Sequence, residues 1–155
     1  MGSAVFRGSN EINMDTKGRM AMPARYRDVL AATCNNCLVA TIDTQEQCLF
    51  MYPLPVWEGI EAQIGGLSTF NPDTRRLQHL LIGHARDLEL DGSGRILIPT
   101  ELRAYAQLDK KIMLVGQNHR LELWNLDIWN SRRETWLKEA AGELVIPPEI
   151  QSLSL

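Results

Sequence analysis

The stretch DTKGRMAMP, residues 15–23, sets the expectation for the fold, because a close version of it returns as DGSGRILIP at residues 91–99. At one constant offset the two stretches share an aspartate, a glycine, an arginine and a proline, with apolar residues between the arginine and the proline. A further arginine follows each stretch at the same offset, as Arg27 and Arg103. A repeat of this size indicates two copies of one supersecondary unit in a single chain.

The repeat extends along the chain with a change of spacing. LFMYPLPVW at residues 49–57 recurs loosely as LELWNLDIW at residues 121–129, at an offset four residues smaller. The second copy is therefore shorter in its middle, and we place the boundary between the halves near Ala85. The chain is thus predicted to have three parts, a first half at 5–84, a second half at 85–144 and an extended tail at 145–155.

Each copy predicts the same order of elements. A short strand runs into a turn, where an aspartate can accept a local backbone N–H and a glycine suits a positive φ. The returning strand ends at Pro23 or Pro99, and proline is tolerated in the first turn of the helix that we expect next. More strands follow each helix, and QNHR at residues 117–120 reads as the polar interval of a hairpin. The predicted class is α+β.

Apolar residues at helical spacing predict which helix faces are buried. The first copy's helix is expected to bury Tyr26, Val29, Leu30 and Thr33, and the second copy's helix Leu102, Tyr105 and Ala106. Longer peripheral helices are predicted at residues 53–67, 71–85 and 126–144. Asn71 is the expected cap of the second of these, and Gly65-Gly66 ends the first. Trp129 and Trp136 on the third are expected in the core or at a subunit interface.

The composition is that of a soluble globular protein rather than a disordered or membrane-spanning one. The chain has 155 residues, of which 45% are hydrophobic and 23% charged. No apolar run approaches the ~18 residues of a membrane span, and the start lacks the apolar region of a signal peptide. Three cysteines make an odd count, which favours reduced thiols in a reducing compartment. CNNC at residues 34–37 has no second pair of ligands for zinc.

Charge is distributed unevenly along the chain. The net charge is −3, yet residues 1–30 hold five Lys/Arg and three Asp/Glu, a net of +2, so the rest carries −5. A polyanionic partner is therefore expected to meet the first segment.

The sequence holds no constellation that points to an enzyme. It lacks a nucleophile motif and a phosphate-binding loop of known spacing. His79 and His84 stand five residues apart, which is not the spacing of a zinc helix. We therefore expect no catalytic residue, no cofactor and no metal. Arg75-Arg76 is read as a solvated helix face, with a supplementary phosphate contact as the alternative.

The repeated pattern, Asp-x-x-Gly-Arg followed by an apolar run and a proline, resembles the swapped-hairpin unit of the AbrB and SpoVT transition-state regulators. Two such units in one chain resemble the MraZ family. The resemblance spans nearly all of residues 5–144 and includes FRGSNEINMDTKGRMAMPARYR, RRLQHLLIGHA, ELDGSGRILIPTELR and IMLVGQNHRLELW, with the closing SLSL. It implies tandem AbrB-like halves that form an internal pseudo-dimer, with additional helices at the periphery.

The same resemblance implies a function. Members of the family are bacterial, sequence-specific regulators that bind double-stranded DNA at short direct repeats upstream of their own division and cell-wall gene cluster. We expect a repressor of that cluster, assembled as a ring-like homo-oligomer, in the cytoplasm and associated with the nucleoid. No membrane partner is expected.

The resemblance and the charges place the DNA-binding site on the first copy. A glycine-tight tip would project Lys17 and Arg19 together, and arginine suits bidentate contacts with guanine or phosphate. Asp15 could pair with Arg19 across the turn and aim it; the alternative is a plain salt bridge that only fastens the turn. The predicted DNA-binding residues are Arg7, Asp15, Lys17, Gly18 and Arg19. A possible second DNA-binding or interface motif consists of Asp91, Gly94 and Arg95.

Two other functions remain as alternatives to DNA-binding regulation. An AbrB-type antitoxin would bind a toxin through its tail, although such chains usually carry one unit. A structural ring-forming protein would use the arginines at contacts between subunits.

Overall fold

The computed structural model describes residues 5–142 and 145–153. The first residues of the chain and the last part of the SLSL motif lie outside this range, as does the predicted boundary between the second half and the tail. The strands are β1 (Ser9–Asn13), β2 (Arg19–Ala21), β3 (Cys37–Ile42), β4 (Leu49–Pro53), β5 (Arg86–Glu89), β6 (Arg95–Leu97), β7 (Lys111–Gln117) and β8 (Arg120–Asn125). The helices are α1 (Ala24–Cys34), α2 (Leu54–Gly65), α3 (Pro72–Leu81), α4 (Thr100–Ala106), α5 (Leu126–Ala141) and α6 (Pro148–Gln151).

A six-stranded antiparallel sheet shows the internal symmetry of the chain directly. Its strand order is β1-β7-β8-β4-β3-β5, so each strand of one half faces its counterpart across the centre. At the centre β4 pairs with β8, and Phe50 lies opposite Glu122, its match in the repeat. The fold is α+β, and its two halves form the pseudo-dimer that the family resemblance implies.

A separate two-stranded sheet, the β2–β6 ribbon, joins one strand from each half. Met20 lies opposite Ile96, again a matching pair in the repeat, and both side chains are buried. Backbone hydrogen bonds extend the pairing symmetrically, from Met22 N to Gly94 O and from Ile98 N to Gly18 O, each 2.9 Å long. The ribbon and the six-stranded sheet share one hydrophobic core.

The halves are interleaved rather than packed side by side. A simple hairpin would pair β1 with β2, but β1 pairs with β7 of the second half and β2 with β6. In the same way β5 of the second half pairs with β3 of the first. This exchange agrees with the swapped-hairpin unit that the family resemblance implies, because each returning strand pairs with its counterpart in the other copy.

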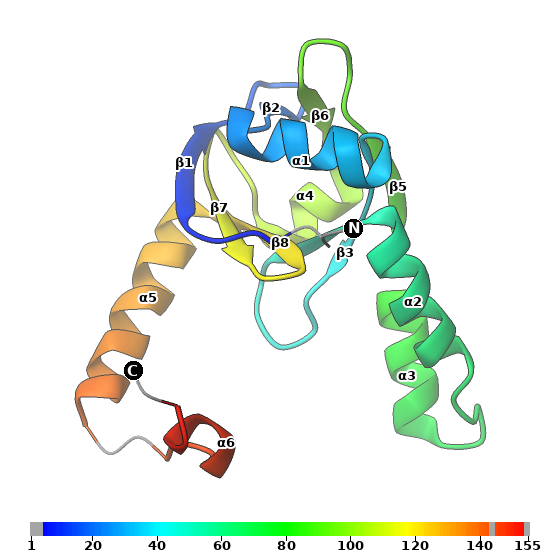
Figure 1. The fold of residues 1–155 in the computed structure, drawn as a ribbon, viewed down its shortest axis with the longest axis vertical. Helices are drawn as coiled ribbons and strands as arrows, with labels where there is room; N and C mark the ends of the chain where they lie inside the picture. The colour runs from blue at the N-terminus through cyan, green and yellow to red at the C-terminus, as the bar shows by residue number, and fades with distance from the viewer. Residues whose placement is uncertain (1–4, 143–144, 154–155) are drawn as a thin grey trace.

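Helices project from the core as two arms (Figure 1). The α2–α3 hairpin forms one arm, and Asn71 caps α3 by accepting hydrogen bonds from the backbone N–H groups of Asp73 and Thr74, as predicted. Helix α2 ends at Gly65, also as predicted. Helix α5 forms the other arm, and its Trp129 and Trp136 pack against buried Trp124 with ring centroids 5.4 and 5.9 Å away.

Two sequence expectations about helices are wrong. The tail is not wholly extended, because residues 148–151 form the short helix α6, whose Pro148 is already set to a helical φ. In α1 Thr33 is exposed and the neighbouring Cys34 is buried instead. The C-terminal turn of α1 thus directs a cysteine, not the threonine, to the core.

The CNNC segment ends a helix. Asn35 and Asn36 have positive φ values of 53° and 64°, so they turn the chain from α1 into β3. Cys34, Cys37 and Cys48 are free thiols, and burial raises the pKa of Cys34. Among the residues that the structure describes, no helix is long and apolar enough to cross a membrane.

Candidate nucleic-acid interface

The turn at residues 15–19, here called tip one, is built by the side chain of Asp15. Its Oδ1 accepts hydrogen bonds from the backbone N–H groups of Lys17 and Arg19, both 2.9 Å long. Its Oδ2 accepts a hydrogen bond from Nε of Arg19, also at 2.9 Å. The predicted pairing across the turn is therefore present, and it uses Nε of Arg19 rather than a terminal guanidinium nitrogen.

The turn at residues 91–95, here called tip two, repeats this design with a looser ion pair. Asp91 Oδ1 accepts from the backbone N–H groups of Ser93 and Arg95 at 2.8 and 3.0 Å. The contact between Arg95 Nε and Asp91 Oδ2 is 3.8 Å long, too long for a hydrogen bond. The arginine of tip two is thus held less closely by its own aspartate.

Hydrogen bonds to the carboxylates lower the pKa of both aspartates below the ordinary value. For Asp15 the largest cause is the backbone N–H of Arg19, with a smaller contribution from the Arg19 side chain. For Asp91 the backbone N–H groups of Arg95 and Ser93 contribute most, and the charge of Arg19 adds to them. The charge of Arg19 in tip one therefore helps, as the smallest cause, to lower the pKa of the aspartate of tip two.

The β2–β6 ribbon carries the arginines of both tips on one face. Because side chains alternate along a strand, the burial of Met20 and Ile96 directs the flanking residues outward. Arg19 lies opposite Leu97, and Arg95 lies opposite Ala21. Both arginines are partly exposed, so a surface with two guanidinium groups covers this end of the molecule.

Each tip glycine lies beneath an arginine of the opposite half. Gly18 has a φ of 92°, and a Cβ built on it would lie 2.5 Å from Nε of Arg103. Gly94 has a φ of 74°, and its Cβ would lie 2.5 Å from Cδ of Arg27. The positive φ predicted for these turns is confirmed. The role of Arg27 and Arg103 was not predicted, although their place in the repeat was a signal for it.

The structure does not bring Arg7 to tip one. Arg7 precedes β1 and Asp15 follows it, and a five-residue strand spans about 16 Å at ~3.3 Å per residue. Instead, the carbonyl of Arg7 accepts a hydrogen bond from the Tyr26 hydroxyl. Arg25 lies near this end of β1, where it donates to Asn10 at 2.6 Å. Arg7 is exposed but belongs to a second basic area beside α1.

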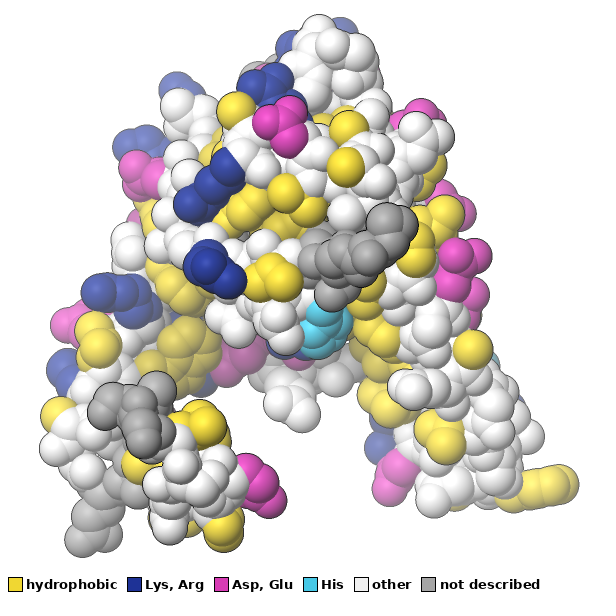
Figure 2. All heavy atoms as spheres, in the orientation of Figure 1, with side chains coloured by type: hydrophobic (Ala, Val, Ile, Leu, Met, Phe, Trp, Pro, Cys, Tyr) yellow, Lys and Arg dark blue, Asp and Glu magenta, His cyan; other side chains and the backbone are white. Residues whose placement is uncertain are grey.

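The two tips lie together at one end of the molecule, opposite to the two arms (Figure 1). In Figure 2 Lys and Arg side chains are concentrated over the upper and left parts of the visible face, with single acidic side chains between them. Apolar side chains follow the arms. The predicted site residues, Arg7 apart, therefore converge on a polar end of the molecule that a large ligand can reach.

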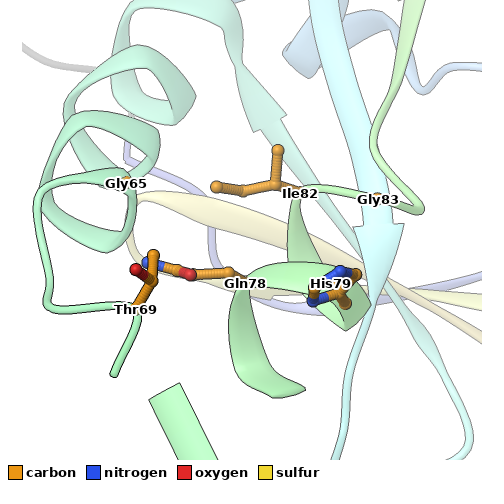
Figure 3. A pocket seen from close by; sticks show the side chains of 6 residues that line it. All are labelled: Gly65, Thr69, Gln78, His79, Ile82 and Gly83. Carbon is orange, nitrogen blue, oxygen red and sulfur yellow. The ribbon is translucent and has the colours of Figure 1, made fainter. Parts of the chain in front are cut away.

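A shallow hollow on the α2–α3 arm offers no comparable chemistry (Figure 3). Gly65, Thr69, Gln78, His79 and Ile82 line it. Nδ1 of His79 lies 2.7 Å from the Arg75 carbonyl oxygen, and Gln78 donates to the Ile64 carbonyl oxygen. Both polar side chains are therefore engaged with the arm itself. The described residues contain no group of three or more His, Cys, Asp or Glu side chains that could hold a metal.

Comparison with known proteins agrees with this architecture. The model of the family described as "MraZ protein", a description that includes the term "antitoxin-like", matches residues 5–80 and 81–141. The transcriptional regulator MraZ of Alkalilimnicola ehrlichii is 56% identical over 151 residues, which cover 97% of this chain and all of the relative. Proteins of the same name from Halorhodospira halophila and Pseudomonas aeruginosa are 48% and 52% identical, with the same coverage of both chains.

The interleaved halves and the paired Asp-x-x-Gly-Arg tips define a tandem AbrB-like protein. Two matched units and relatives of full length narrow that class further. The chain belongs to the MraZ family.

Proposed function

We propose that this chain is a sequence-specific DNA-binding transcriptional regulator, and that it is not an enzyme. The observation that carries the proposal is tip one, where Asp15 fixes Arg19 by its Nε on an exposed turn. An exposed ion pair alone contributes little to stability because solvent screens it, so fastening the turn is a weak reason for this arrangement. The names of the relatives, transcriptional regulator MraZ, support the same function.

The geometry suits insertion into the major groove. A two-stranded ribbon is narrow enough to enter that groove, and the β2–β6 ribbon presents Arg19 and Arg95 on its outer face. An arginine whose orientation is already fixed loses less conformational freedom on binding guanine O6/N7 or a phosphate. Lys17, also exposed at tip one, adds a flexible charge suited to the phosphate backbone.

We propose that the regulator assembles as a ring and binds short direct repeats. Exposed apolar residues on both arms support self-association, since such side chains favour burial against a partner. On the α2–α3 arm these are Leu67, Phe70 and Leu77. Leu137 lies on the α5 arm, and Ile146, Ile150 and Leu153 follow that arm near the end of the chain. Contacts between different surfaces of neighbouring subunits close into a ring when the rotation permits. Identical tips then repeat around an axis, as direct repeats require.

The proposed target is the DNA upstream of the protein's own division and cell-wall gene cluster, where binding represses transcription. The protein would accordingly act in the cytoplasm, associated with the nucleoid. An antitoxin is the second candidate, because the description of the matched family includes that term. The short helix α6 near the end of the chain would then be the segment that meets a toxin.

The test is the affinity of Arg19→Ala for the DNA directly upstream of the gene. We expect most specific binding to be lost while the circular dichroism spectrum stays unchanged, because the arginine lies on a surface turn. Arg133→Ala is the matched control, since Arg133 is also an exposed arginine but lies on α5. If Arg19→Ala binds within a few fold of the wild type, tip one is not the DNA-binding site.

A further inference from the structure

A loop of the second half lies directly against tip one. The backbone N–H of Met14, just before the tip, donates to the carbonyl of Lys110 at 2.7 Å. Lys110 follows α4 and immediately precedes β7. A hollow of about 400 Å³ separates the two segments, and Asp15, Thr16, Arg103 and Lys110 are among the residues that line it. Residues of both halves thus share one surface at this tip.

Arg103 connects the loop side to the tip through well-defined contacts. Its Nε donates to the carbonyl of Ile98 at 2.9 Å, and its Nη2 lies 3.0 Å from the hydroxyl oxygen of Thr100. These bonds anchor the guanidinium to the second half. The Nε, Cζ and Cδ atoms of the same side chain lie over Gly18. The position of Gly18, and with it the turn that carries Arg19, therefore depends on a side chain of the other half.

The charge at this surface favours an anion. Asp15 is already engaged by Arg19, which leaves Asp109 as the other carboxylate lining the hollow, against Arg103 and Lys110. Lys110 is exposed and forms no ion pair with another residue of the part of the chain that the structure describes. Its ammonium group can therefore approach a phosphate without breaking an existing contact.

Tip two has no lysine at the place that corresponds to Lys110. The backbone contact equivalent to Met14–Lys110 runs from Leu90 N to the carbonyl of Asn36, at 3.1 Å. Asn36 thus occupies the place of Lys110, and Ser93 of tip two occupies the place of Lys17. Arg27 still covers the glycine. The two tips share their turn geometry but differ by two lysines.

We propose that Lys110 contacts the DNA phosphate backbone beside tip one, and that Arg103 is a positioning residue that holds the tip in its binding shape. This inference rests on the proposed DNA-binding function and adds residues of the second half to its site. It also explains why tip one, rather than tip two, is the principal DNA contact. The first half supplies the arginine that reads the groove, and the second half supplies backbone affinity and rigidity.

The phosphate contact of Lys110 and the positioning role of Arg103 predict different dependences of DNA affinity on salt concentration. Each neutralised phosphate contributes about −0.9 to the slope of log K against log salt concentration. Lys110→Asn, which introduces the residue present at tip two, should make the slope less steep by about 0.9 per bound tip. It should also weaken binding to all sequences alike, by roughly three- to tenfold. Arg103→Ala should weaken specific binding more than non-specific binding, with little change in slope, because it alters the shape of the tip.

The experiment measures both variants and the wild type by fluorescence anisotropy over a range of salt. The probes are the DNA directly upstream of the gene and a random duplex of the same length. Lys138→Asn is the control, since it removes the same charge from an exposed site on α5. Arg103→Lys accompanies Arg103→Ala in case the alanine variant unfolds, and it should restore part of the specificity without restoring the full affinity.

The outcomes distinguish a failure of the proposed DNA-binding function from a failure of the proposed roles of Lys110 and Arg103. If the wild type does not prefer the upstream DNA, the proposed function itself fails. If the wild type binds specifically but Lys110→Asn behaves like Lys138→Asn, the phosphate contact is wrong. If folded Arg103 variants keep wild-type specificity, the positioning role is wrong.

Discussion

At the scale of single residues, two glycines decide whether the tips can form. Gly18 and Gly94 combine a positive φ with an arginine of the opposite half directly above the position of a Cβ. Residues with side chains rarely adopt this backbone conformation, and a β-branched one least of all. The glycines of the repeat are therefore explained both by the turn and by the crossed arginines.

Gly18→Val should reduce stability by roughly 1–3 kcal/mol and weaken DNA binding, because strain and the clash with Arg103 act together. Gly92→Val is the control, because a Cβ at Gly92 meets nothing within 4 Å. Its position in tip two corresponds to Thr16, which is itself β-branched. It should stay within about 0.5 kcal/mol of the wild type. Urea denaturation and anisotropy with upstream DNA measure both effects, and equal behaviour of the two variants would show that the turn at Gly18 is ordinary.

The pKa of Asp15 tests which hydrogen bonds of tip one hold its carboxylate. Its pKa lies below the ordinary aspartate value of 3.8, chiefly because of the backbone N–H of Arg19. Arg19→Ala should therefore raise the pKa only part of the way back, since that N–H remains. NMR titration of the carboxyl carbon measures it, and a complete return to the ordinary value would assign the effect to the side chain.

The direction of the pKa shift of Asp15 determines how this carboxyl contributes to the free energy of unfolding as the pH changes. A carboxyl whose pKa is lower in the folded state contributes its full stabilisation above the unfolded pKa, and that contribution disappears as the pH falls through the folded pKa. The loss for Asp15 is thus confined to pH values below about 3.8. The ion pair that holds Arg19 is intact at neutral pH, where DNA binding is measured.

At the scale of elements, the β2–β6 ribbon couples the two tips. Met20 and Ile96 face each other and each residue is only 1% exposed, while Leu97 is 54% exposed. A three-residue strand has few backbone hydrogen bonds, so the ribbon depends on this buried pair. A change at the centre of the ribbon should therefore disturb both tips at once.

Met20→Ala should lower the free energy of unfolding by about 2–5 kcal/mol, from lost burial and the cavity left behind. Leu97→Ala removes an apolar side chain from the same ribbon, but from its exposed face, and should cost less than about 1 kcal/mol. Chemical denaturation of the two variants gives the comparison. Similar losses for both would mean that the ribbon is not anchored through its inner face.

The same ribbon shows how far the sequence could predict the structure. The aspartate and glycine of each turn, the proline that ends each returning strand and the cap at Asn71 all act within a few residues, so their pattern was sufficient. The partner of each returning strand was not readable from the residues alone, because Met20 is an equally good apolar partner for either half. Only the family resemblance indicated the exchange.

The residues of the candidate site likewise fall into those that the local sequence predicts and those that only the pairing of distant strands brings to the site. Local chemistry predicted Asp15, Gly18 and Arg19, which the structure brings together at tip one. Arg7 lies away from tip one, because the length of β1 separates it from Asp15, and its contact with DNA stays a prediction. The proposed contribution of Lys110 could not be predicted at all, since its proximity to tip one results from the pairing of β1 with β7.

At the scale of the whole molecule, the proposed function gives the tips and the arms separate tasks. The tips occupy one end and carry Lys17, Arg19 and Arg95, while the arms carry exposed apolar residues among charged ones (Figures 1 and 2). One tip with a few cations can neutralise few phosphates, so a single subunit should bind weakly. Linking identical tips makes each further contact intramolecular, with a gain of ~10²–10⁴ in avidity when the spacing fits.

The most direct test of the account is operator affinity as a function of repeat number and spacing, at fixed salt. An operator with one repeat should bind poorly, and affinity should rise with each further repeat placed one helical turn, about 10 bp, away. An insertion of about 5 bp between repeats should remove most of that gain, because it turns alternate sites away from the protein. Affinity that is independent of both number and spacing would mean that one subunit suffices, and would contradict DNA binding by a ring of identical tips.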